Sequence, residues 1–391
     1  SGYTDDWEQR KLNEIADKVS EKNKNNEFSE PFTNSAEQGI ISQKDYFDRE
    51  IVNNENLNGY YIVRNDDFIY NPRISATAPV GPINRNRLGR NGVMSPLYTV
   101  FRTHDIDNLY LEFYFKTTKW HRFMKLNGDS GARFDRFTIS STQFMEMPIP
   151  YPTLEEQQKI GEYFESLDTL ITLHQRKLEK LQNMKKSCLQ KMFPKDGATV
   201  PEIRFSEFQG DWEERTLGSC FDERLESLPD GELLSVTIGS GIKKFSELDR
   251  HDNSNTDKSK YKRVCIGDIA YNSMRMWQGA SGRSPYEGIV SPAYTVVKPI
   301  GDIDTQFFAY MFKKKEIIHL FEINSQGLTS DTWNLKYPAF SKIVVRVPRN
   351  VEEQSRIARF LLELDELISC TEQEIEITKR MKKGCLQKMF V

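Results

Sequence analysis

Apolar residues recur at alternating intervals of four and three positions in two long stretches of the chain, one after Pro152 and one after Pro348. This average spacing of about 3.5 residues places the apolar side chains along one face of a helix, as in a coiled coil. The pattern predicts long helices over 153–193 and 350–391. The seam residues are Ile160, Phe164, Leu167, Ile171, Leu178 and Leu181 in the first helix, and Ile357, Leu361, Leu364, Ile368 and Ile375 in the second.

Polar residues mark the start of each helix and interrupt its seam. Thr153 and Glu156 have the spacing of a capping box, and Asn350 is a favourable cap for the second helix. A helix of roughly 40 residues spans roughly 60 Å, and alone it is only marginally stable. We therefore expect the two helices to pair, although the seam does not decide between parallel and antiparallel. His174 is interpreted as a seam residue, because an isolated histidine lacks the clustered ligands of a metal site.

A ten-residue segment, here called the repeated phrase, occurs twice in the chain. Met184–Phe193 returns as Met381–Phe390 with one substitution and an offset of 197 positions. At that offset, 155–193 and 352–390 are identical at 18 of 39 positions, and weaker matches continue upstream. This period is far too long for a solenoid repeat. The sequence therefore predicts a duplication, in which each half is a globular region followed by a long helix.

Each globular region has the pattern of a mixed α/β (α+β) domain. Short apolar runs between Asn-Gly and other turn residues predict strands, and aromatic residues at helical spacing predict helices over 105–126 and 302–322. The predicted strands include Tyr60–Val63, Phe68–Tyr70, Tyr98–Phe101 and Ile343–Val347. The expected organisation is a first domain over 1–152, a helix over 153–193, a linker over 194–209, a second domain over 210–349 and a helix over 350–391.

Composition and motifs limit the class of protein. Hydrophobic residues make up 38% of the chain, and no apolar run approaches the roughly 20 residues of a membrane span. The five scattered cysteines favour a reducing compartment, so a cytoplasmic protein without membrane segments is expected. We find no phosphate-binding loop, nucleophile elbow or zinc-protease motif. These observations predict that the chain is not an enzyme and holds no metal.

Charge is distributed unevenly although the net charge is only −3. Two stretches in corresponding parts of the halves, 68–104 and 269–286, contain arginines and no acidic residue. A basic patch on a neutral protein is typical of nucleic-acid binding. Solvated loops are an equal alternative on charge alone, because short charge runs are common.

Several motifs occur in the same order in both halves. Pro148–Gln157 and Val345–Gln354 each join a strand to a helix that begins with Glu-Glu-Gln. The other shared residues are Gly131 and Gly327 before these segments, and Trp7 and Trp212 near the start of each region. Over the whole chain, this plan resembles that of the specificity subunit of type I restriction–modification systems.

The resemblance implies a function and a set of partners. Each domain would be a target-recognition domain that reads one half of a split double-stranded DNA target, while the two helices pair antiparallel as a spacer. Two methyltransferase subunits would dock on the assembly, and restriction/translocase subunits would join it. S-adenosylmethionine, ATP and Mg²⁺ would belong to those partners, so that this chain itself holds no cofactor.

Arginine and asparagine side chains in the acid-poor regions are candidates for DNA contact, because arginine can read guanine and asparagine can read adenine. Thr329 aligns with Arg133, so the two halves are expected to read different bases. The candidates are Arg73, Asn84, Arg85, Asn86, Arg87, Arg90 and Arg133 in the first domain, and Lys243, Lys244, Arg275, Arg283 and Thr329 in the second. Asn84–Arg87 is expected to lie on a loop. Two other classes remain open: a stand-alone DNA-binding protein, and a coiled-coil scaffold without DNA recognition.

Overall fold

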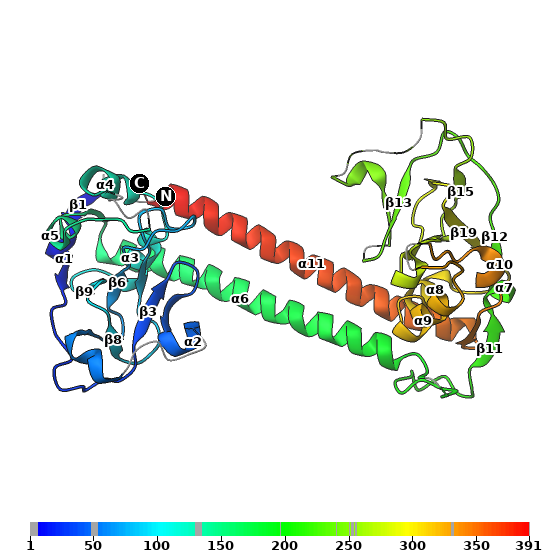
Figure 1. Cartoon of the computed structure of the whole chain (residues 1–391), viewed down its shortest axis with the longest axis horizontal. Helices are drawn as coiled ribbons and strands as arrows, with labels where there is room; N and C mark the ends of the chain where they lie inside the picture. Colours follow the sequence, from blue (N-terminus) through cyan, green and yellow to red (C-terminus); the bar gives the residue numbers. More distant parts are fainter. Residues whose placement is uncertain are drawn as a thin grey trace. The chain divides into compact units, whose positions relative to one another are not determined.

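The chain folds into two compact units, each of which contains residues from both halves of the sequence. A computed structural model describes residues 7–47, 54–129, 135–195, 197–239, 241–249, 251, 254, 256–329 and 332–390. Unit 1 comprises residues 1–175 together with 374–391, and unit 2 comprises residues 176–373 (Figure 1). The two long helices, α6 (Leu154–Lys191) and α11 (Val351–Met389), each begin in one unit and end in the other. The predicted long helices are therefore confirmed.

Unit 1 is built on a four-stranded antiparallel sheet in the order β2-β9-β6-β7, with three further strand pairs, β1–β10, β3–β4 and β5–β8. The strands are β1 (Glu8–Lys11), β2 (Ala16–Lys18), β3 (Phe32–Ser35), β4 (Gly39–Ser42), β5 (Tyr61–Val63), β6 (Phe68–Tyr70), β7 (Ile83–Arg85), β8 (Gly92–Met94), β9 (Thr99–Thr103) and β10 (Pro148–Tyr151). The short helices are α1 (Leu12–Ile15), α2 (Gln43–Phe47), η1 (Asn54–Gly59), α3 (Asn108–Phe115), α4 (His121–Asn127) and α5 (Ser141–Met145).

Unit 2 repeats this topology strand for strand. Its four-stranded sheet has the order β12-β19-β16-β17, and its strand pairs are β11–β20, β13–β14 and β15–β18. The strands are β11 (Glu213–Thr216), β12 (Phe221–Glu223), β13 (Leu234–Thr237), β14 (Gly241–Lys244), β15 (Lys262–Val264), β16 (Ile269–Asn272), β17 (Ser281–Arg283), β18 (Gly288–Val290), β19 (Tyr294–Pro299) and β20 (Val344–Val347). The short helices are α7 (Leu217–Cys220), η2 (Phe245–Glu247), η3 (Met276–Gln278), α8 (Thr305–Met311), α9 (Lys315–Ile323) and α10 (Tyr337–Phe340). The duplication therefore extends through the divergent globular regions.

The central strand of each sheet is buried on both faces. Phe68 and Tyr70 of β6 pack into the main core of unit 1, while Ile69 joins a second apolar cluster on the other face. Strand β16 repeats this arrangement, with Ala270 alone facing the second cluster. Successive side chains of a strand point to opposite faces, so a strand covered on both sides reads as an uninterrupted apolar run.

The predicted helix over 105–126 is two helices in the structure, α3 and α4. The break occurs because side chains satisfy the last carbonyl groups of α3: Thr117 Oγ1 donates to the Tyr114 carbonyl and Trp120 Nε1 donates to the Phe115 carbonyl. The prediction over 302–322 is divided in the same way into α8 and α9. The aromatic stripe of both regions is core, as its spacing predicts.

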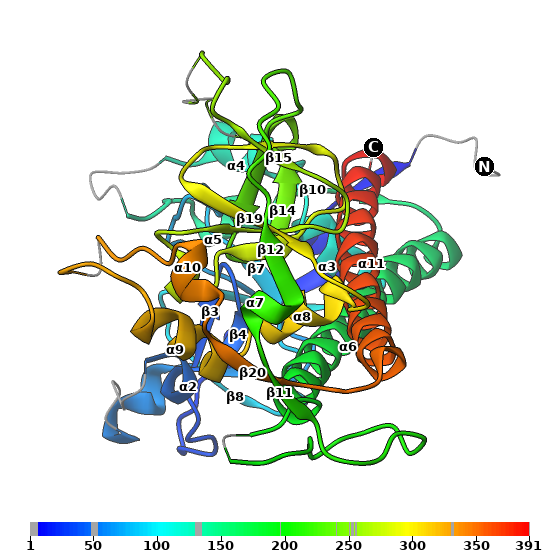
Figure 2. The ribbon, with the colours of Figure 1, turned by 90° about the vertical axis from the view of Figure 1, so that its right-hand side faces the viewer.

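Within unit 1, α6 and α11 run antiparallel. Asp168 forms an ion pair with Lys382, and His174 Nδ1 lies 2.9 Å from a carboxylate oxygen of Glu374, so partners further along α6 are earlier on α11. In unit 2, Lys185 forms an ion pair with Asp365, whose other oxygen accepts a hydrogen bond from Tyr310 of α8 at 2.8 Å. Figure 2 shows the strands and short helices of unit 2, α8 among them. The two ion pairs occupy equivalent positions in the two halves of the chain, because the aspartates are 197 positions apart and so are the lysines.

The repeated phrase fills the core of each unit from the end of a long helix. Phe390 is fully buried in unit 1, where its ring centroid lies 5.3 Å from that of Tyr110 and 5.9 Å from that of Phe164. Phe193 is buried in unit 2, with its ring centroid 5.1 Å from that of Phe307. The core of unit 1 is thus completed by the end of α11, which follows the second domain in the sequence. The core of unit 2 is completed by the end of α6, which follows the first domain.

The glutamine of each Glu-Glu-Gln motif fastens the long helix to a short helix of its own domain. The Gln157 side chain accepts from the Asp107 backbone N–H at 2.9 Å and donates to the Pro152 carbonyl at 2.8 Å. Gln354 makes the corresponding bonds to the Asp304 N–H and the Pro348 carbonyl, both at 3.1 Å. Asp107 and Asp304 are the N-caps of α3 and α8, so the motif fixes where the long helix leaves each domain.

Replacement of Phe390 by alanine is expected to lower the free energy of unfolding by about 3–5 kcal/mol, because it removes a fully buried ring. Denaturant unfolding measures the change. Lys388→Ala, at an exposed position of the same helix, is the control and is expected to stay within about 0.5 kcal/mol of the wild type. Equal effects of the two substitutions would show that the phrase does not complete the core of unit 1.

Candidate nucleic-acid interface

A backbone bridge between Asp129 and Thr138 closes a hairpin in unit 1, of which residues 129 and 135–138 are described. Of the predicted DNA-contacting residues, Arg73 lies beside this hairpin, and Arg133 lies outside the described residues. Arg73 forms a backbone bridge with Arg136 of this hairpin, and the Ile74 N–H donates to the Asp135 carbonyl at 3.0 Å. We call Arg73 together with the described parts of this hairpin the hairpin surface of unit 1. The Arg73 side chain is exposed there.

Unit 2 has the equivalent hairpin surface, formed by 326–334 and the segment that contains Arg275. Backbone hydrogen bonds between Gln326 and Asn334, at 2.8 and 3.1 Å, close the hairpin. The Trp277 and Trp333 rings join it to η3 with centroids 5.3 Å apart. Three exposed side chains of different chemistry face outward on this surface: Arg275, Leu328 and Thr329.

The hairpin arginines are free of carboxylate partners. In the described part of the chain, neither Arg73 nor Arg275 takes part in an ion pair. An exposed guanidinium without a partner keeps its donors for a phosphate or for a base edge. On each hairpin surface an exposed arginine therefore keeps its donors available, and the other described side chains differ between the units.

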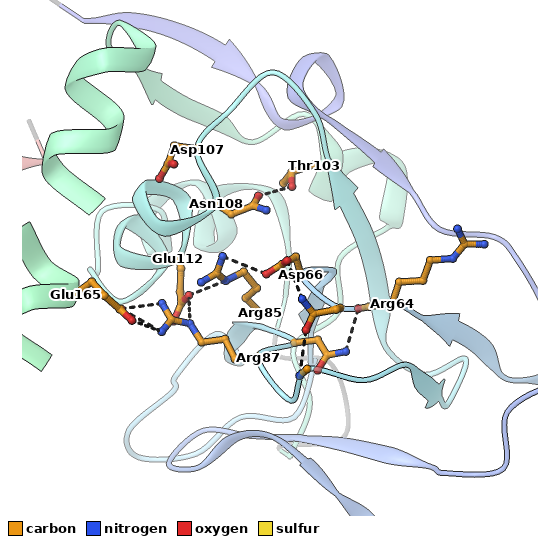
Figure 3. Close-up of polar contacts among 12 residues, drawn as sticks. Arg64, Asp66, Arg85, Arg87, Thr103, Asp107, Asn108, Glu112 and Glu165 are labelled. Atoms are coloured by element: carbon orange, nitrogen blue, oxygen red, sulfur yellow. Dashed lines mark hydrogen bonds and ion pairs between the residues drawn. The ribbon is translucent and has the colours of Figure 1, made fainter. Parts of the chain in front are cut away.

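Arg85 and Arg87 are engaged in ion pairs instead. Arg85 Nε lies 2.9 Å from Glu112 and its other end 3.2 Å from Asp66, while Arg87 reaches Glu112 at 2.7 Å and Glu165 of α6 at 3.0 Å (Figure 3). Only 10% of the Arg85 side chain is exposed. These arginines join strand β7 to helices α3 and α6. The pKa of Arg87 is raised, since its bonds to the two glutamates outweigh the lowering effect of burial.

Asn84 and Asn86, which adjoin these arginines, have structural partners, and the expectation that Asn84–Arg87 forms a loop is wrong for Asn84 and Arg85, which lie in strand β7. Asn84 is part of strand β7, and its amide donates to the Asn34 side chain at 2.7 Å. Asn86 is fully buried, with its amide donating to the carbonyls of Arg64 at 2.9 Å and Arg90 at 3.0 Å. Arg90 itself is exposed and paired with Glu30 at 2.8 Å.

The other predicted residues of unit 2 lie on β14 and β17, outside the hairpin 326–334. Lys243 is exposed, and Lys244 lies over the Tyr286 ring at 5.4 Å. Arg283 Nε donates to Thr305 Oγ1 at 3.0 Å and is half-buried. The structure therefore separates the predicted positions of each unit into a hairpin group and a sheet-edge group.

The residues described by the structure hold no group of histidines, cysteines and carboxylates suited to a metal ion. They also contain no helix long and apolar enough to cross a membrane. Buried carboxylates have structural roles: Asp67 holds Arg102 at 2.7 Å, and Asp268 holds Arg224 at 2.6 Å at equivalent positions of the two sheets. The chemistry available at the surface is ionic and hydrogen-bonding recognition.

Comparison with known proteins identifies a family for the first part of the chain. Residues 4–183 match the family model of the type I restriction modification DNA specificity domain. Two similar proteins from Methanocaldococcus jannaschii are the putative type I restriction enzyme MjaX specificity subunit, 24% identical over 263 residues, and the type I restriction enzyme MjaVIII specificity subunit, 23% identical over 330 residues. The chain therefore carries a type I restriction modification DNA specificity domain and is similar to specificity subunits.

The extent of these matches differs between relatives. The MjaX alignment covers 63% of this chain and 59% of the relative, and the MjaVIII alignment covers 76% and 73%. Two solved specificity subunits share the fold at 14% identity: one from Thermoanaerobacter tengcongensis, with a TM-score of 0.52, and one from M. genitalium, with a TM-score of 0.58. Both alignments cover 100% of this chain and 98% of the solved chain. The mixed α/β fold with two long helices is therefore that of specificity subunits.

Sequence reasoning did not single out the residues that connect the recognition domains to the long helices. Gln157 and Gln354 are visible in the sequence only as parts of a repeated motif, and their bonds to the N-caps of α3 and α8 depend on the fold. The sequence analysis also did not predict a role for Lys116, which lies 3.8 Å from Asp168 of α6, or for Lys313, which donates to the carbonyls of Gly279 and Ser281. They stand 197 positions apart, the offset of the helices, so extending the repeat at that offset beyond the helices would have found them.

Arg85→Ala is expected to lower the free energy of unfolding by about 1–3 kcal/mol, because it leaves the buried Glu112 with one strong partner fewer. Arg90→Ala is the matched control, because it breaks an exposed ion pair that contributes little to stability. Denaturant unfolding of both variants measures the difference. If Arg85→Ala were as stable as Arg90→Ala, the structural role of Arg85 would be wrong.

Proposed function

We propose that this chain is a specificity subunit that gives a type I restriction–modification complex its DNA target, with each unit reading one half of a split, asymmetric sequence. One observation carries the proposal: the two units share a topology of ten corresponding strands but present different side chains on equivalent hairpin surfaces. Equal scaffolds with different exposed groups suit the recognition of two different half-sites.

The hairpin surfaces supply the chemistry of recognition. Arg73 and Arg275 are positioned to pair with guanine or with phosphate, and phosphate contacts would fix the register of each unit on the duplex. Arg133 belongs to the same proposal, at the position that Thr329 occupies in unit 2. Lys243, Lys244, Arg283 and Arg90 would add phosphate contacts. Asn84, Arg85, Asn86 and Arg87 support the domain rather than touch bases.

The long helices complete the proposed assembly. The antiparallel pair of α6 and α11 would set the gap between the half-sites and dock two methyltransferase subunits, which restriction/translocase subunits join. This chain would act by binding and positioning alone, in the cytoplasm. Methyl transfer to adenine needs the base flipped out of the duplex, which the methyltransferase would perform with S-adenosylmethionine, while ATP and Mg²⁺ would serve the restriction subunits.

Co-expression of the chain with its methyltransferase subunit, followed by mapping of methylated adenines, tests this function. The expected result is methylation within one split motif that has a fixed gap and two different halves. Specific DNA binding by the chain alone, without methylation, would favour a stand-alone DNA-binding protein. An assembled complex that binds no DNA would favour a scaffold and overturn the proposal.

Arg73→Ala and Arg275→Ala should relax opposite halves of the motif. Loss of a bidentate contact to guanine costs about 1–3 kcal/mol of discrimination at one position, whereas loss of a phosphate contact lowers affinity evenly and reduces the salt slope by about 1. The measurement is binding of the assembled methyltransferase to half-site variants at several salt concentrations. Arg380→Ala, at an exposed position of α11 outside the proposed DNA contacts, serves as the control. Unchanged affinity, specificity and salt slope in both variants would remove the hairpin surfaces from the interface.

A further inference from the structure

The side chain of Lys313, which lies between α8 and α9 of unit 2, joins separate segments of the domain. Its amine donates to three backbone carbonyls, that of Ile238 at 3.0 Å, that of Gly279 at 2.7 Å and that of Ser281 at 2.8 Å. A protonated lysine has three N–H donors and no acceptor. The three bonds therefore use the whole donor capacity of the amine, and only its charged form can make all of them.

Two of these carbonyls belong to the turn that begins at Arg275, the exposed arginine of the hairpin surface. The Ala280 N–H donates to the Arg275 carbonyl at 3.2 Å, which closes the turn on itself. Gly279 and Ser281 lie at the far end of the turn, where their carbonyls accept from Lys313. The amine therefore fixes the backbone from which the Arg275 side chain projects.

The third carbonyl belongs to the connection between β13 and β14, the strand that carries Lys243. Strand β14 approaches β17 closely, because a Cβ added to Gly282 would lie 2.9 Å from the Gly241 Cα. Ile238 follows β13 directly, and its bond to Lys313 adds a second tie between these neighbouring segments. One amine thus holds two segments that each carry a predicted DNA contact.

The equivalent lysine of unit 1 has different partners. Lys116 stands 197 positions before Lys313, and its amine lies 3.2 Å from Glu112 and 3.8 Å from Asp168. Glu112 is the carboxylate at the centre of the contacts in Figure 3. Unit 2 has Ala309 at the corresponding position. Loss of this carboxylate leaves the charge of Lys313 to be balanced by the carbonyl dipoles.

The surroundings of Lys313 disfavour its charge. Burial and the neighbouring Lys185 lower the pKa of Lys313 to about 8. Asp365 of α11 is bonded to other donors, since it pairs with Lys185 and accepts from Tyr310. The other titratable or charged groups that line the same pocket are Lys243 of β14, Arg283 of β17, Tyr286, and Glu372 of α11.

We propose that the charged Lys313 is a positioning residue for DNA recognition by unit 2, where it holds the turn at Arg275 and the β13–β14 connection in the arrangement that meets DNA. This inference rests on the proposed function and deepens it, because Lys313 acts through Arg275 and does not itself touch DNA. A neutral amine keeps two donors and gains a lone pair, so one of the three carbonyls loses its bond. Recognition by unit 2 therefore weakens as the pH rises through about 8, whereas recognition by unit 1 does not.

The contribution of Lys313 to the free energy of unfolding follows the opposite course. Its pKa is about 8 in the folded chain and has the ordinary value of 10.5 in the unfolded chain. Between these two values the unfolded chain binds more protons, so this contribution rises with pH. A loss of recognition above about pH 8 is therefore a local effect and is not caused by unfolding.

The test measures binding of the assembled methyltransferase to duplexes altered in one half-site, at about pH 7 and about pH 9, with denaturant unfolding at both. The half read by unit 2 is the half that Arg275→Ala relaxes. Wild type is expected to lose discrimination about tenfold at that half between the two pH values and to keep it at the other half. Lys313→Met, which has no donor, should show the low discrimination at both pH values.

Lys315→Met is the control, because it makes the same change at an exposed position of α9 and should behave as wild type. Wild-type discrimination in Lys313→Met, equal pH responses of the two half-sites, or an Arg275→Ala variant that relaxes neither half would overturn the inference. So would a fall in the unfolding free energy of the wild type that accompanies its loss of discrimination. If Lys313→Met does not fold, the pH dependence of the wild type decides alone. Wild type that discriminates at neither half at about pH 7 would overturn the proposed function itself.

Discussion

The exchange of helix ends between the halves of the chain is the constraint on which the rest of the structure depends. The core of unit 1 is incomplete without Phe390, and the core of unit 2 is incomplete without Met192 and Phe193. A ring that is fully buried on folding contributes several kcal/mol, a large part of the net stability of a domain. The two long helices are therefore bound into both cores, and their pairing is antiparallel because each must end where the other begins.

This arrangement separates what is constant in the molecule from what varies. The helix ends, the Glu-Glu-Gln fastening and the ion pairs Asp168–Lys382 and Asp365–Lys185 recur in both units. The described hairpin residues other than Phe137 are exposed or half-buried, and they lie outside the two main core clusters. Exposed residues are replaced at little cost in stability. The exposed side chains can therefore diverge between the units while the scaffold stays the same.

Local pattern was enough to predict the long helices, their seam and the central strand Phe68–Tyr70, because burial repeats there at the period of the element. It was not enough for Asn86, whose amide bonds to two carbonyls that a tertiary turn brings near. Charge pattern likewise could not tell the paired Arg85 from the unpaired Arg73, since the partner Glu112 lies on another element. The acid-poor stretch 68–104 is therefore partly structural, because Arg85 and Arg87 form ion pairs within unit 1.

Hydrogen exchange of the two copies of the repeated phrase tests the exchange of helix ends most directly. Phe113→Leu loosens the core of unit 1, where Phe113 lies 5.1 Å from the Phe164 ring. The account predicts faster exchange in 381–390 and unchanged exchange in 184–193, although the two segments are nearly identical in sequence. Faster exchange in 184–193 with 381–390 unchanged, or an equal response of both, would contradict it.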